Sequence, residues 1–143
     1  MDDLDRQMLN LLATNARIPV ATMAKKLGVA RSTVQARLER LEVSGTIAGY
    51  TLRLGDAARA QRVHATVLLT IEPRSTPQVL SRLKSLPEVI QVHTTTGRFD
   101  LIIALATRTT EDLDTILDTI GMIPGVRSSE SLIHLSTKID RGI

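Results

Sequence analysis

The 143-residue sequence contains no cysteine, no tryptophan, one tyrosine and one phenylalanine. Without cysteine the chain can form neither disulfides nor thiolate metal sites. No apolar run approaches the roughly 18 residues that a membrane-spanning helix needs. The N-terminal segment MDDLDRQ is acidic, whereas a secretory signal peptide begins with positive charge. We therefore expect a cytoplasmic protein with no membrane partner.

Residues for catalysis or metal binding are equally scarce. His64, His93 and His134 all fall on predicted strands, and three imidazoles on one sheet could bind a metal. They show no short ligand spacing such as His-x-x-x-His, so we interpret them as partly exposed sheet residues. No Gly-x-Ser-x-Gly nucleophile elbow is present. We expect no metal, no cofactor and no enzymatic activity.

Positive charge is concentrated in the N-terminal part of the chain. Residues 1–62 hold 10 Lys and Arg against 6 Asp and Glu, a net charge of +4. Residues 63–143 hold 8 Lys and Arg against 9 Asp and Glu, a net charge of −1. Attraction to phosphate groups is therefore expected from the N-terminal part only.

The N-terminal part is organised around the stretch KKLGVARSTVQARLERL. Val34, Leu38 and Leu41 recur at helical spacing, which predicts one buried stripe along a helix. Gly28 can end the preceding helix with a positive φ at no steric cost. This pattern is typical of two helices joined by a tight turn. We expect a first helix that ends near residue 15 and two more at about 20–27 and 32–43.

The exposed face of the third predicted helix carries small polar and guanidinium groups, which suit a helix in the DNA major groove. Arg31 can pair with guanine and Gln35 with adenine through two hydrogen bonds each. Further along, phosphates are the expected partners. A solvated charged face without DNA contacts is the alternative. The residues predicted to contact DNA are Arg31, Ser32, Thr33, Gln35, Ala36, Arg37 and Arg40, with Lys25 and Lys26 as further phosphate contacts.

Two short segments follow the predicted third helix. TIAGYTLRL is rich in β-branched and apolar residues around Ala48-Gly49, and predicts a two-stranded wing or one strand leaving the DNA-binding unit. GDAARAQR is small and polar, as expected of a hinge. We therefore place a DNA-binding domain at residues 1–54, a hinge at 55–62 and a second domain at 63–143.

The second domain contains an internal repeat with a period of 37 residues. Five apolar positions and one proline superimpose between the two copies, and each copy is predicted to fold as strand, helix and strand. A doubled unit of this length favours a ferredoxin-like βαββαβ sandwich with both helices on one sheet face. The chain as a whole is thus predicted to be α+β, with a winged helix-turn-helix domain followed by the ferredoxin-like domain.

Several predicted strands are apolar on both faces. The stretches ALAT, LLTI and LIHL carry more apolar side chains than one covered face requires. A second copy of the same domain could cover the other face. We therefore predict a symmetric dimer through the C-terminal sheets.

With these residues laid out, the chain resembles the leucine-responsive/asparagine-regulator (Lrp/AsnC) family of bacterial and archaeal transcription regulators. The resemblance rests on LDRQMLNLL, NARIPVATMAKKLGVARSTVQARLERLEVSGTIAGY, LPEVIQVHTTTGRFDLII and IPGVRSSESLIHL, and covers nearly the whole chain. It implies a sequence-specific DNA-binding regulator with a RAM-type ferredoxin-like domain that oligomerises and binds small effectors, often amino acids. Dimers, and tetramers or octamers built from them, are implied as well. Relatives often carry Ser or Thr where this chain has Ala30.

The stretch TTTGRFDLI is the candidate effector site. Gly97 predicts a turn whose backbone N–H groups can face an anion, and Asp100 supplies a carboxylate for an ammonium group. A plain hairpin turn is the alternative from the residues alone; the resemblance, whose Gly-x-x-Asp motif matches Gly97 and Asp100, implies a ligand site between dimers. The predicted effector-binding residues are Thr95, Thr96, Gly97, Arg98 and Asp100, with Ser129 and Ser131 on the last strand.

Two other functions compete with a DNA-binding regulator. Siroheme decarboxylase subunits are similar to the same family in architecture, but a macrocycle pocket needs stacking aromatics, and Tyr50 lies in the DNA-binding half. An absorbance spectrum after adding siroheme would distinguish such an enzyme subunit from a DNA-binding regulator. The other alternative is an adaptor that senses an amino acid without binding DNA, which a gel shift at varied salt would reveal.

Overall fold

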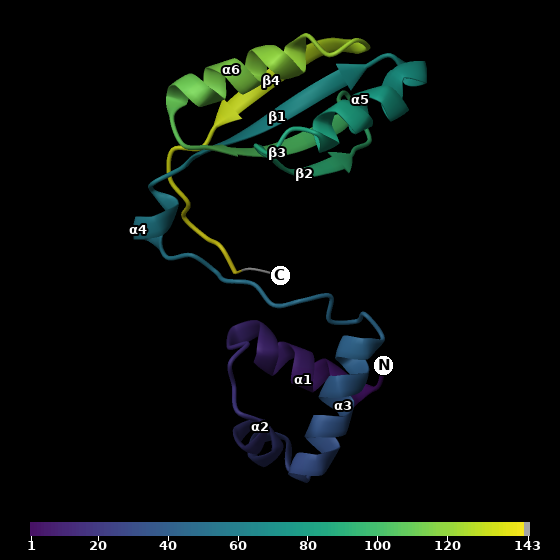
Figure 1. Ribbon diagram of the computed structural model, residues 1–143, viewed down its shortest axis with the longest axis vertical. Helices are drawn as coiled ribbons and strands as arrows, with labels where there is room; N and C mark the ends of the chain where they lie inside the picture. Colours follow the sequence, from purple (N-terminus) through teal and green to yellow (C-terminus); the bar gives the residue numbers. More distant parts are fainter. Residues whose placement is uncertain (142–143) are drawn as a thin grey trace. The chain divides into compact units, whose positions relative to one another are not determined.

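The computed structural model describes residues 1–141, which form two compact units: Met1–Arg53 together with residues 140–141, and Leu54–Ile139. The first unit consists of three helices, α1 (Asp3–Thr14), α2 (Val20–Leu27) and α3 (Arg31–Val43), drawn in purple to blue in Figure 1. These helices pack around a small apolar core of Met8, Leu12, Met23, Ala24, Val34 and Leu41.

Local signals place the ends of these helices. Pro19 stands at the N-cap of α2, and Gly28 ends the helix in the left-handed conformation with φ 69°. The Gly28 N–H donates to the carbonyl oxygen of Ala24. An added Cβ at Gly28 would meet no atom within 4 Å, so the backbone conformation, rather than space, favours glycine there. The helix-turn-helix prediction is confirmed, with α3 beginning one residue early and Ala30 as an N-cap without a side-chain hydrogen bond.

The predicted wing is wrong for the described part of the chain. The segment from Thr46 to Leu54 contains no strand and leads into α4 (Asp56–Arg59), a helix of one turn within the expected hinge. A strand is stabilised by hydrogen bonds to a neighbouring strand. Among residues 1–141, no strand pairs with the segment TIAGYTLRL. Leu52 and Leu54 are consequently exposed.

The second unit is a four-stranded antiparallel sheet with two helices on one face (Figure 1). The strand order is β2-β3-β1-β4, which is the ferredoxin-like arrangement that the repeat predicted. In chain order its elements are β1 (Val63–Ile71), the 3-10 turn η1 (Pro73–Ser75), α5 (Thr76–Lys84), β2 (Val89–Thr94), β3 (Leu101–Thr107), α6 (Thr110–Gly121) and β4 (Val126–Ile133). His134 lies just beyond the end of β4. The prediction that it is a strand residue is therefore wrong.

The main core lies between the sheet and the two helices. Alternate residues of β1, such as Val67 and Leu69, are fully buried against Val79 and Leu83 of α5 and Ile120 of α6. The residues between them face the other side of the sheet, which no element of this unit covers. This surface is called the open face below, and its half-buried part consists of His64, Thr66, Leu68, Thr70, Ile102 and Ala104.

Candidate nucleic-acid interface and effector site

The N-terminal half of α3 presents an accessible polar face. Arg31, Ser32, Gln35 and Ala36 are exposed, and Thr33 is half-buried. The helical period places Ser32 and Ala36 opposite the buried stripe of the same helix, with Arg31, Thr33 and Gln35 flanking them. Within residues 1–141, the side chains of these residues form no hydrogen bond or ion pair. The Arg31 guanidinium and the Gln35 amide, one helical turn apart, are therefore available to donate hydrogen bonds to an external partner.

Arg37 and Arg40, further along α3, are engaged within the unit. Arg37 pairs with Asp2 and also lies 3.4 Å from Asp5, while the Arg40 guanidinium lies 3.3 Å from the Asp5 carboxylate. The hydrogen bond from Arg37 lowers the pKa of Asp2 to about 2. The same bond raises the pKa of Arg37 above its usual value. These partners lie 32 to 35 residues away in sequence and were missed by the sequence analysis.

A spacing signal for part of this network does exist in the sequence. Asp2 and Asp5 form a capping box at the start of α1, in which each side chain accepts a hydrogen bond from the backbone N–H of the other. Acidic residues three apart at a helix start are typical of that arrangement. The spacing therefore predicts the capping box, but it does not predict that Arg37 and Arg40 pair with these aspartates.

Lys25 and Lys26 lie exposed in the last turn of α2, directly before the turn at Gly28. Their charges suit the negative end of the helix dipole. Within the described residues their side chains form no ion pair, so both ammonium groups remain available to phosphates.

The predicted effector residues around Gly97 form a tight turn between β2 and β3. Gly97 has φ 96°, and the Thr95 hydroxyl donates to the carbonyl oxygen of Phe99 at 2.8 Å. Asp100 is already engaged, because its Oδ2 accepts a hydrogen bond of 2.8 Å from the backbone N–H of Ile71. Asp100 therefore joins the turn to the end of β1.

The last strand contributes charged groups that the sequence analysis did not single out. Ser129 and Ser131 are exposed on β4, and Glu130 between them lies 3.8 Å from the guanidinium of Arg98. Arg127 pairs with Glu72 at 2.7 Å, which lowers the pKa of the Glu72 carboxyl. The structure thus brings the turn, the end of β1 and the start of β4 together at one edge of the unit.

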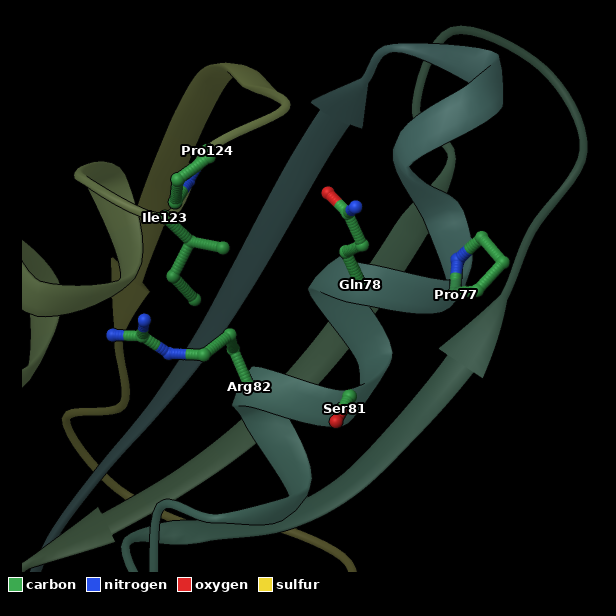
Figure 2. Close-up of a pocket in the computed structure, with 6 residues that line it drawn as sticks. All are labelled: Pro77, Gln78, Ser81, Arg82, Ile123 and Pro124. Carbon is green, nitrogen blue, oxygen red and sulfur yellow. The ribbon is translucent and has the colours of Figure 1, made fainter.

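A separate hollow of about 470 Å³ lies between α5 and the turn that follows α6. Figure 2 shows Arg82 reaching from α5 toward the segment that carries Ile123. None of the predicted effector residues lines it, and its lining carries a guanidinium but no carboxylate: Pro77, Gln78, Ser81, Arg82, Ile123 and Pro124. It could pair with the carboxylate of an amino acid but offers no counter-charge for the ammonium group.

Over residues 1–141, no cluster of three His, Cys, Asp or Glu side chains is arranged to hold a metal ion. No helix in this range is both long and apolar enough to cross a membrane.

Comparison with known proteins links each unit to a described domain. Residues 1–42 match the AsnC-type helix-turn-helix domain, and residues 64–143 match the Lrp/AsnC ligand binding domain. The chain is 30% identical to the HTH-type transcriptional regulator FL11 of Pyrococcus furiosus, over 94% of this chain and 89% of that protein. It is 31% identical to the regulatory protein AsnC of Escherichia coli K12, over 100% of this chain and 95% of that protein.

Solved structures give the same result. The structure of E. coli AsnC superimposes with a TM-score of 0.87, at 31% identity, covering 100% of this chain and 97% of that one. A transcriptional regulator of Neisseria meningitidis in complex with L-Met has the same fold, with a TM-score of 0.84 at 21% identity over 95% of this chain and 90% of that one. This chain belongs to the Lrp/AsnC family of transcription regulators.

Proposed function

We propose that this chain binds duplex DNA through the N-terminal half of α3 and regulates transcription in response to a small effector, an amino acid. The observation that carries the proposal is the exposed face of Arg31, Ser32 and Gln35, whose side chains form no bond within residues 1–141. Groups of this kind read base edges in the major groove. Lys25 and Lys26 would add phosphate contacts at the turn before α3.

The effector proposed for the second unit is an amino acid held at the turn of Gly97 and Asp100. One oxygen of the Asp100 carboxylate holds the N–H of Ile71, which leaves the other oxygen for an ammonium group. Thr95, Thr96 and Arg98 would line the site, and Ser129 and Ser131 would complete it from β4. The match to a ligand binding domain supports this proposal, as does the L-Met complex of a protein with the same fold.

The open face is the proposed surface for self-association. Leu68 lies between Ile102 on β3 and Glu130 on β4 in the sheet register, and both aliphatic side chains are only half-buried. A second copy would remove them from water, which favours a symmetric dimer. Light scattering on the full chain tests the dimer, and a monomer at micromolar concentration would refute it.

The test of DNA binding is an affinity comparison on two duplexes. A duplex is selected from a random-sequence pool with the full chain, and a scrambled duplex of equal length and composition is the control. We expect the selected duplex to bind about 10³-fold or more tightly, with affinity falling as salt rises. Equal affinity for both duplexes would refute a sequence-specific regulator, and failure to bind either duplex would favour the adaptor.

A further inference from the structure

Asp5 is a buried carboxylate that caps the start of α1 and also pairs with two arginines of α3. Its side chain is 3% exposed and accepts a hydrogen bond of 3.2 Å from the backbone N–H of Asp2. The same carboxylate lies 3.4 Å from Arg37 and 3.3 Å from Arg40, both on α3. A carboxylate so far removed from water is stable only when opposite charges and hydrogen bonds compensate it, as they do here.

The two arginines that pair with Asp5 differ in their number of carboxylate partners and in their exposure to solvent. Arg37 has two carboxylate partners, Asp2 and Asp5, and its side chain is 26% exposed. Arg40 has Asp5 alone and is 62% exposed. Both guanidinium groups belong to the helix that is proposed to enter the major groove, yet both are neutralised from within the unit.

We propose that Asp5, together with Asp2, is a specificity-determining pair that touches no DNA: it holds Arg37 and Arg40 on the protein and away from phosphates. The inference rests on the DNA-binding function proposed above. Because phosphate contacts carry no sequence information, withholding two cations lowers the affinity for any duplex more than it lowers base recognition. The same ion pairs tie α3 to α1 and fix how Arg31 and Gln35 are presented.

The decisive variant is Asp5→Asn, which keeps an oxygen for the capping box and removes the carboxylate charge that holds Arg40 and one of the two that hold Arg37. Asp3→Asn is the matched control, since it makes the same charge change in the same turn of α1, at a side chain whose one bond within residues 1–141 is to Gln7. Affinities for the selected and scrambled duplexes are measured between 50 and 300 mM salt. For Asp5→Asn we expect the salt slope on the scrambled duplex to steepen by about 0.9 for each guanidinium released. The preference for the selected duplex should fall about fivefold or more, while Asp3→Asn changes neither.

Other results would overturn the inference. A purely structural Asp5 would lower the melting temperature of Asp5→Asn and leave the salt slope and the preference unchanged. Arg40→Gln gives a second test that does not depend on the folding of Asp5→Asn. We expect it to leave the salt slope unaltered, and a slope shallower by about 0.9 would mean that Arg40 contacts a phosphate. Failure of the wild-type chain to bind any duplex would instead refute the proposed function on which the inference rests.

Discussion

The two proposed sites of this protein differ in what their polar groups do within the chain. On the first half of α3, Arg31, Ser32 and Gln35 are exposed and form no internal bond in residues 1–141. At the turn between β2 and β3, Thr95 and Asp100 both hold the backbone in place. A change on the α3 face should therefore alter binding alone, whereas a change at the turn alters the fold as well.

Removing the two base-reading groups should have the largest effect. For Arg31→Ala combined with Gln35→Ala, we expect a loss of about 2–6 kcal/mol in binding to the selected duplex, at about 1–3 kcal/mol for each bidentate pair. The free energy of unfolding should change by less than about 0.5 kcal/mol. Fluorescence anisotropy and denaturant unfolding measure the two quantities.

A matched control for that variant exists on α5. Gln78→Ala combined with Arg82→Ala removes the same two side-chain types, again four residues apart, from exposed positions of a helix in the second unit. This control should bind the selected duplex as the wild type does. Equal losses in the two double variants would mean that the α3 face has no special role.

Truncating Asp100 should have a smaller effect, on stability rather than on DNA binding. Asp100→Ala leaves the N–H of Ile71 without its acceptor, which costs about 1–3 kcal/mol in the free energy of unfolding. Asp100→Asn keeps an acceptor oxygen and should lose less stability, but it removes the charge proposed to hold an ammonium group. Unfolding experiments with and without each of the twenty amino acids separate the two roles. A response retained in Asp100→Asn would place the effector elsewhere.

The smallest expected effect is a pH dependence in the first unit. Because Arg37 depresses the pKa of Asp2 from 3.8 to about 2, the ion pair stabilises the folded state above pH 3.8. That contribution is lost as the pH falls through about 2, where Asp2 becomes protonated in the folded state. Arg37→Gln should therefore melt at a lower temperature than the wild type at pH 6, and this difference in melting temperature should shrink toward pH 2. A difference that stays constant with pH would contradict the stabilising role of the Asp2–Arg37 ion pair.

The parts of the fold that could be predicted are those set by residues close together in the sequence. Pro19 and Gly28 mark the ends of α2, and the sequence placed that helix at the residues where the structure has it. The 37-residue repeat predicted the βαββαβ order because each copy carries its own strand and helix periods. The wing was mispredicted, since β-branched composition says nothing about whether a neighbouring strand is present.

The sites were harder to predict because their contacts are not local. The N-terminal aspartates were visible as acidic residues at a helix start, but their pairing with Arg37 and Arg40 depends on how α1 packs on α3. The bond from Ile71 to Asp100 likewise joins residues 29 apart. The exposed α3 face could be predicted because the helical period alone places Ser32 and Ala36 away from the buried Val34, whereas Gln35 and Arg31 flank that face.

The absence of cysteine allows one direct test of the division between the two sites. Ser32→Cys and Ser129→Cys each place a single thiol at an exposed position, the first on α3 and the second on β4. With the selected duplex well above its Kd, alkylation of the thiol at position 32 should slow about tenfold or more, while the thiol at position 129 reacts as in free protein. Protection of position 129 by DNA, with position 32 still freely alkylated, would contradict the account.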